Sequence, residues 1–157
     1  MQMEEKKLED KGFSLSSSPK RDRRPGEPTS AYKGATWAAL LLGTISYLVG
    51  LYNATMELNE KGYYLIILIF GLYAAVSLQK AVRDKEEGIP VTAIYFGLSW
   101  FALIAAVSLM AIGLYNAGSI ILSEKGFYAM AFALSLFSAV TLQKNIRDAQ
   151  ESEDQHK

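Results

Sequence analysis

The sequence predicts an all-α protein: a four-transmembrane-helix membrane bundle made of two tandem helical-hairpin repeats in parallel orientation. Two observations predict this fold. Charged residues are confined to the tails and to short connecting segments, and the second half of the chain repeats the pattern of the first. Asp, Glu, Lys and Arg are absent from residues 34–56, 62–79, 88–123 and 126–143. Each stretch is long enough for a membrane-spanning helix, which needs about 20 apolar residues.

The four spans follow from these stretches in order. We expect them to cover about residues 35–53, 62–79, 93–116 and 126–143. A soluble helix carries a polar face that recurs about every 3.6 residues, and the stretch YYLIILIFGLYAAVSLQ has none. The strands of a membrane barrel alternate apolar and polar residues over about ten positions, whereas these runs are continuous. Helical spans therefore explain the pattern best.

The remaining segments divide the chain into a tail, two repeats and a second tail. Residues 1–33 are charged and rich in Ser, Pro and Gly, which predicts a disordered basic cytoplasmic tail. Residues 34–88 and 89–149 form the first and second two-helix repeats, and residues 150–157 form a polar cytoplasmic tail. The chain has no cysteine and one histidine, so thiolate chemistry is excluded. We expect no metal, no cofactor and no nucleic-acid partner.

Lysine and arginine placement predicts the orientation. Under the positive-inside rule these residues concentrate at the cytoplasmic ends of spans. They flank the start of the first span (Lys20, Arg21, Arg23, Arg24, Lys33), the connection between the second and third (Lys80, Arg83, Lys85) and the end of the fourth (Lys144, Arg147). The other two connections hold one lysine each, Lys61 and Lys125. Both termini and the central connection should therefore be cytoplasmic.

An internal repeat relates the two halves. The string GLYNA occurs at residues 50–54 and 113–117, and residues 60–84 align with 124–148 through EKG(Y/F)Y and LQKxxRD. Because each unit contains an even number of spans, both copies insert with the same orientation and are related by an axis along the membrane normal. Inverted-repeat transporter architectures are thereby disfavoured.

These strings resemble the two-helix domain of the YiaA/YiaB family of bacterial inner-membrane proteins, most of all its two-copy YiaA type. The resemblance covers about residues 36–149 and rests on the repeated EKG(Y/F)Y and LQKxxRD strings. It implies a multi-pass protein of the bacterial cell inner (cytoplasmic) membrane. It implies no activity and no functional residues, and the tail before residue 36 is not part of the family pattern.

Small residues recur at spacings that let helices approach closely. Gly43 and Gly50 in the first span correspond to Ala106 and Gly113 in the third, and Gly71 and Ala75 in the second correspond to Ser135 and Ala139 in the fourth. Packing within one bundle explains them, and a dimer interface is the alternative.

Asn53 and Asn116 form a candidate polar membrane site. Each ends an odd-numbered span one position after a tyrosine. Asparagine tolerates the left-handed conformation that often ends a helix, which favours a capping role. A symmetric polar pair that faces a partner or a solute is the alternative.

The boundary that we expect outside holds a second candidate site, consisting of Glu60, Lys61, Glu124 and Lys125. Asn59 and Ser123 precede the acids, so we expect them to be the N-caps of the second and fourth helices, each followed by an acid in its first turn. The alternative is an outward-facing polar site formed by the two Glu-Lys pairs.

The boundary that we expect inside holds a third candidate site. Its members recur in both repeats: Gln79, Lys80, Arg83, Asp84, Gln143, Lys144, Arg147 and Asp148. The lysines and arginines among them are explained if they fix the orientation of the spans in the membrane. Contact with lipid head groups or a cytoplasmic partner is the alternative, because Lys and Arg one helical turn apart share a face.

The predicted spans contain no ionisable side chain, and proton relays and ion-coupled transport need such groups within the bilayer. We therefore expect a multi-pass integral membrane protein without enzymatic activity, acting as an accessory, membrane-organising or stress-related component. Its partners would be the lipid bilayer and a homodimer or membrane-protein complex. The alternative is a passive channel or transporter component formed by a homodimer.

Overall fold

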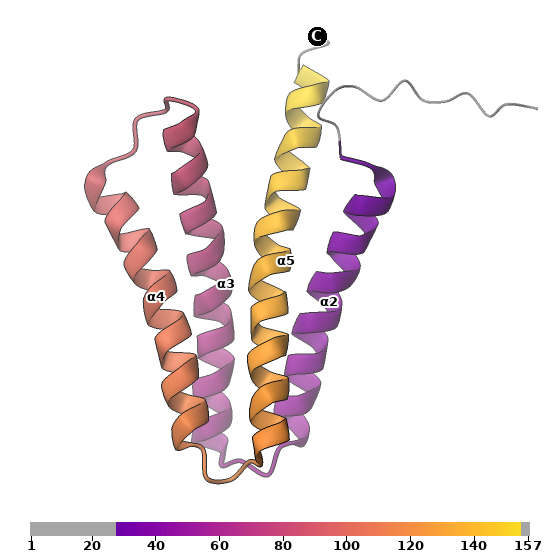
Figure 1. Cartoon of the computed structure of the whole chain (residues 1–157), viewed down its shortest axis with the longest axis vertical. Coiled ribbons are helices and arrows are strands. Elements are labelled where there is room, and N and C mark those ends of the chain that lie inside the picture. The colour runs from indigo at the N-terminus through magenta and orange to yellow at the C-terminus, as the bar shows by residue number, and fades with distance from the viewer. Residues whose placement is uncertain (1–27, 155–157) are drawn as a thin grey trace, which may run out of the picture.

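The computed structural model describes residues 28–154 and contains four long helices (Figure 1). They are α2 (Ser30–Asn53), α3 (Leu58–Glu86), α4 (Ala93–Asn116) and α5 (Leu122–Asp154). Each is long and apolar enough to cross a membrane, which confirms the four predicted spans. The prediction of a disordered tail concerns mostly residues 1–27, which lie outside the described residues.

The helices are longer than the apolar stretches that predicted them. α2 begins at Ser30, inside the segment assigned to the N-terminal tail, and α5 continues to Asp154, inside the segment assigned to the C-terminal tail. α2 starts there because the Thr29 hydroxyl accepts a hydrogen bond from the Tyr32 amide at 3.0 Å. Such a cap satisfies one of the free amides at a helix start, and Thr92 caps α4 in the same way through the Tyr95 amide.

The two repeats interlock rather than forming two separately packed hairpins. α2 packs mainly against α5, α3 packs mainly against α4, and α3 and α5 meet in the middle. Figure 1 shows the resulting pairs, with α4 beside α3 and α5 beside α2. The two helices of one repeat touch little, and α2 does not contact α4. Each repeat therefore supplies one helix to each pair.

The two ends of the bundle differ. At one end lie the short connections 54–57 and 117–121 together with several tyrosines, and we call it the tyrosine end. The other end, the charged end, holds the C-terminal turns of α3 and α5 and the starts of α2 and α4. The pairs lie close together at the tyrosine end and diverge toward the charged end (Figure 1).

Glycines set the distance between the paired helices. A Cβ atom on Gly43 of α2 would lie 2.8 Å from the Ser135 hydroxyl and 3.1 Å from the Ser135 backbone nitrogen. Gly50 lies against the Phe127 ring, and its repeat equivalent Gly113 lies against the Tyr63 ring. These small residues thus pack inside one bundle, as their spacing suggested.

A cluster of three tyrosines joins α2, α3 and α5 near the tyrosine end. The Tyr47 hydroxyl donates to the Tyr64 carbonyl at 2.9 Å, which satisfies a polar group on a buried residue. The Tyr128 ring meets the Tyr47 ring edge-on, with centroids 5.4 Å apart, and stacks on the Tyr64 ring. Aromatic pairs in these geometries add to the stabilisation from burial alone.

Candidate functional site

The asparagines of the candidate polar membrane site bond to their own helices. The Asn53 side-chain amide donates to the Val49 carbonyl at 2.8 Å, and the Asn116 amide donates to the Ile112 carbonyl at 2.9 Å. The residue after each has extended backbone angles, so these helices end without the left-handed residue that the cap hypothesis used. The asparagines lie on α2 and α4, which do not contact each other, so one copy of the chain does not bring them together.

The acids at the tyrosine end bond to the helix starts. Glu60 accepts a hydrogen bond from the Glu57 amide at 3.1 Å, and Glu124 accepts one from the Ile121 amide at 2.9 Å. The predicted N-cap role of Asn59 was wrong, because Glu57 is the N-cap of α3. Ser123 likewise lies inside the first turn of α5.

The lysines beside these acids bond to the preceding helix. The Lys61 ammonium donates to the Tyr52 carbonyl at 2.9 Å, and the Lys125 ammonium donates to the Tyr115 carbonyl at 3.5 Å. Cations near the last carbonyls of a helix also interact favourably with its dipole. Each Glu-Lys pair therefore closes one short connection, the acid binding the start of the next helix and the lysine the end of the previous one.

The tyrosine end also brings the two repeats together. The Thr55 hydroxyl contacts the Ser119 carbonyl, and the Ser119 hydroxyl contacts the Glu60 carboxylate, both at 3.4 Å. Beside them lies a pocket of about 330 Å³, whose lining includes Asn59, Glu60, Tyr63 and Asn116. Asn116 and Glu60, predicted in separate candidate sites, thus line one pocket.

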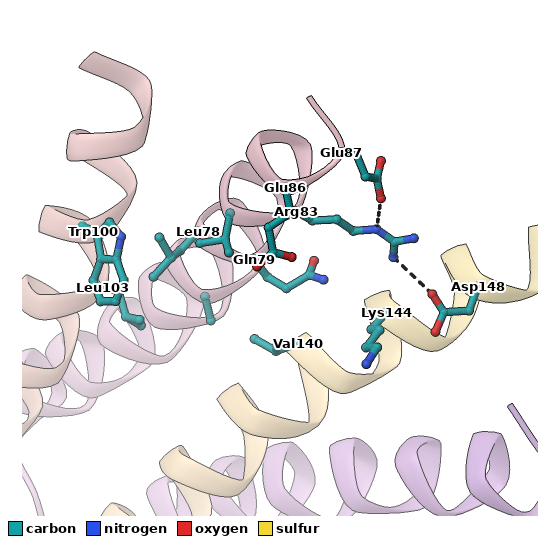
Figure 2. Close-up of a pocket in the computed structure, with 12 residues that line it drawn as sticks. Leu78, Gln79, Arg83, Glu86, Glu87, Trp100, Leu103, Val140, Lys144 and Asp148 are labelled. Atoms are coloured by element: carbon teal, nitrogen blue, oxygen red, sulfur yellow. Dashed lines mark hydrogen bonds and ion pairs between the residues drawn. The ribbon is translucent and has the colours of Figure 1, made fainter. Parts of the chain in front are cut away.

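The charged end holds a network of two arginines and four carboxylates. Its members are Arg83, Asp84, Glu87, Arg147, Asp148 and Glu151. Arg83 Nε lies 2.6 Å from Glu87 Oε1, and Arg83 Nη2 lies 2.6 Å from Glu151 Oε1. Arg83 Nη1 lies 3.3 Å from Asp148 Oδ1, and Figure 2 shows the contacts of Arg83 with Glu87 and Asp148.

Arg147 repeats these contacts from the opposite helix. It lies 3.2 Å from the Asp84 carboxylate and 2.6 Å from the Glu87 carboxylate, both on the segment at the end of α3. It lies 3.4 Å from the Glu151 carboxylate on its own helix. Because Arg147, Asp148 and Glu151 are the repeat equivalents of Arg83, Asp84 and Glu87, the network is reciprocal about the axis between α3 and α5. The recurring arginines and aspartates therefore bind each other.

Sequence reasoning missed the two glutamates of the network. Glu87 and Glu151 lie beyond the aligned region that ended at Asp84 and Asp148. A signal was present, since the pattern Arg-Asp-x-x-Glu occurs in both repeats. In a helix, Arg and Glu four residues apart lie on the same face.

The other predicted residues of the charged end take different positions. Gln79 and Lys144 line a cavity of about 550 Å³ between α3, α4 and α5 (Figure 2). Lys80 is exposed. The side-chain oxygen of Gln143 is buried and has no hydrogen-bond partner among the described residues.

A buried amide, also missed, breaks the repeat symmetry. The Asn145 side chain donates to the Thr36 hydroxyl at 3.1 Å and thereby joins α5 to α2. Its repeat equivalent is Ala81, which is also buried. The difference between KNIRD and KAVRD was visible in the sequence, but only the packing shows that this side chain lies inside. Within residues 28–151, no cluster of three acidic or histidine side chains could hold a metal ion.

Comparison with known proteins agrees with the repeat architecture. The profile described as "yiaA/B two helix domain" matches residues 32–84 and again residues 95–148. No solved structure matches the chain.

Two relatives are membrane proteins. The chain is 52% identical over 128 residues to "Inner membrane protein YiaA" of Escherichia coli strain K12, an alignment that covers 82% of this chain and 88% of the relative. It is 38% identical over 60 residues to "Uncharacterized membrane protein YubF" of Bacillus subtilis strain 168, covering 38% of this chain and 69% of the relative. With both repeats matched and four helices of membrane-spanning length, the chain belongs to the YiaA/B two-helix domain family.

Proposed function

We propose that this protein is a non-enzymatic accessory component of the inner membrane, which helps to organise a larger membrane assembly. The observation that carries the proposal is the reciprocal network at the charged end. It uses the recurring arginines and acids to hold α3 to α5. The Glu-Lys pairs at the tyrosine end close the connections in the same way. Because these recurring side chains bind other parts of the same chain, a structural role is favoured over catalysis.

Native mass spectrometry of the protein extracted in lipid nanodiscs tests this proposal. An accessory component should carry a different membrane protein at fixed stoichiometry. A network variant is a poor probe of partner binding, because it also loosens the bundle. Lys80 is a better position for testing partner binding, because it is exposed. Lys80→Glu reverses a surface charge and leaves the ion pairs of the network in place. If the protein emerges only as copies of itself, the accessory role is wrong.

A passive pathway through a homodimer is the second candidate. The observation that favours it is the pocket of about 330 Å³ at the tyrosine end, whose lining includes the polar side chains of Asn116 and Glu60. Both asparagines are exposed, so a partner copy could approach them. In liposomes, a pathway predicts solute flux that falls when Asn53→Leu and Asn116→Leu are combined. Flux that is absent, or unchanged by this pair, would exclude these residues as lining groups.

We further propose that the charged end faces the cytoplasm, as the positive-inside rule predicts. The chain has no cysteine, so single cysteines can report the topology. Thr55→Cys and Gly118→Cys, at the tyrosine end, should react with an impermeant thiol reagent added outside intact cells. Ile89→Cys, in the connection after α3, should react only after the membrane is opened. The reverse labelling pattern would overturn the orientation.

A further inference from the structure

An open apolar groove lies between α4 and α5. These two helices make little contact with each other, and the space between them is about 480 Å³. Its walls include Val107 and Ala111 of α4 and Ala129, Ala133 and Phe137 of α5. The volume falls within the range of about 300–1,000 Å³ that is usual for small-molecule sites.

The two repeats differ at the positions that open this groove. Ala111, Ala129 and Ala133 stand where the first repeat has Leu48, Leu65 and Ile69. The second repeat thus carries three methyl groups in place of three large aliphatic side chains. Duplication alone would leave equal side chains on the α4–α5 face and on the equivalent α2–α3 face of the first repeat. The asymmetry makes the groove a feature of the α4–α5 face.

The groove continues to the charged end. Ala75, Leu103 and Val140 line both the apolar groove and the cavity of about 550 Å³ beside the network. From Ala129 to Val140 the rise of α5 is about 16 Å. This rise covers about half of the hydrocarbon core, which is about 30 Å thick. Ala129 lies close to the tyrosine-end limit of the predicted span 126–143, and Lys144 lies just beyond its other limit. The combined groove therefore runs along most of the membrane thickness and reaches the level of the lipid head groups at the charged end.

At the charged end of the bundle, the lining of this groove changes from apolar to charged. Figure 2 shows Trp100 and Leu103 of α4, Leu78 and Glu86 of α3 and Lys144 of α5 around the cavity. Tryptophan is enriched at the membrane–water interface. Arg83 is already engaged by three carboxylates. Within residues 28–151, Lys144 and Glu86 have no ion-pair partner, so both remain available to a head group.

We propose that this groove binds one zwitterionic phospholipid of the bilayer, with an acyl chain between α4 and α5 and the head group between Lys144 and Glu86. The ammonium of Lys144 suits the phosphate, and the carboxylate of Glu86 suits the lipid amine. The charges that line the cavity are two cations, Arg83 and Lys144, and three carboxylates, Glu86, Glu87 and Asp148. This balance disfavours a lipid with net negative charge.

A transmembrane helix of a second copy is the competing occupant. The apolar groove leads directly into a cavity whose lining includes Lys144 and Glu86, which have no ion-pair partner within residues 28–151. The predicted spans of this chain carry no charged side chain to meet them, whereas a lipid supplies both an apolar chain and a charged head group.

The test uses the full chain reconstituted in membranes with equal amounts of phosphatidylethanolamine and phosphatidylglycerol, then extracted in mild detergent. Native mass spectrometry should show one retained phosphatidylethanolamine per chain. The variant Ala129→Leu with Ala133→Ile gives α5 the side chains of the first repeat and should lose that lipid. Both alanines are exposed, so the larger side chains enter open space, and circular dichroism checks that the bundle stays folded.

Ser108→Leu is the matched control. Ser108 lies on α4 beside Val107, is exposed and is not among the groove residues, so this variant should keep the lipid. Glu86→Lys should shift the retained lipid toward phosphatidylglycerol. Absence of retained lipid in the wild type, or equal retention in the filled and control variants, would overturn the groove site. Retention of phosphatidylglycerol by the wild type would overturn the head-group assignment.

Discussion

Replacing Gly43 by leucine is expected to force α2 away from α5 and to lower the thermal unfolding temperature of the detergent-solubilised protein. Even a Cβ at this position would meet the Ser135 backbone nitrogen at 3.1 Å and the Ala131 carbonyl at 3.2 Å. Backbone atoms of a helix cannot rotate away as a side chain can. Overpacking a close contact costs typically about 1–3 kcal/mol, and occasionally more. Thermal unfolding followed by circular dichroism measures the effect.

Gly97 of α4 supplies the control for this experiment. A Cβ on Gly97 would meet nothing within 4 Å, so Gly97→Leu adds the same bulk to a membrane-spanning helix without a clash. Equal unfolding temperatures for the two variants would show that α2 and α5 do not approach each other at Gly43.

Reversing one arginine of the network is expected to loosen the charged end. In Arg83→Glu, one cation of the network is lost and a fifth carboxylate is added. The Arg83 side chain is 14% exposed, so solvent screens its contacts only in part. Charge-assisted hydrogen bonds contribute about 1.5–3 kcal/mol each, but partly exposed pairs contribute less. We therefore expect a loss of about 1–3 kcal/mol in the free energy of unfolding, measured by denaturant titration at low salt.

Lys80→Glu is the comparison for the arginine variant. Lys80 lies one turn earlier on α3 and is exposed, so reversing its charge should change stability by much less. High salt should shrink the difference between the two variants, because salt screens exposed charges. A charge swap provides a further comparison. The double variant Arg83→Glu with Arg147→Glu should be destabilised, and adding Glu87→Arg with Glu151→Arg should restore part of the lost stability. If Arg83→Glu is as stable as Lys80→Glu, the network does not hold α3 to α5.

The spans and the repeat could be predicted from the sequence because both are encoded by where charge is absent and where strings recur. The pairing of helices could not. An arrangement in which α2 packs on α3 and one in which α2 packs on α5 place the same residues in the membrane. The choice depends on shape, such as the fit of Gly43 against Ser135. The sequence marked Gly43 as a packing residue without naming its partner.

The charged end was predicted in part. The recurrence of Arg83 and Asp84 as Arg147 and Asp148 was visible, and lipid or partner contact was one interpretation of it. Glu87 was missed because it lies beyond Asp84, where the aligned region ended, and beyond the predicted end of the membrane span at about Gln79. α3 in fact continues to Glu86. The added turns bring side chains of both repeats within hydrogen-bonding distance.

The groove also illustrates the limit of pattern reasoning. Ala129 and Ala133 align with Leu65 and Ile69 in the repeat, so the size difference could be read from the sequence. Its meaning depends on the separation of α4 from α5, which no local pattern encodes.

The interlocked packing of the two repeats is tested most directly by a cross-link between α2 and α5. The Thr44 and Ser135 hydroxyl oxygens lie 3.4 Å apart, and the chain has no native cysteine. Thr44→Cys with Ser135→Cys should form a disulfide on oxidation in membranes. With a protease site introduced in residues 88–91, the two halves of one chain should then stay joined after cleavage. Halves that separate, or that join only between different chains, would contradict the packing of α2 on α5 within one molecule.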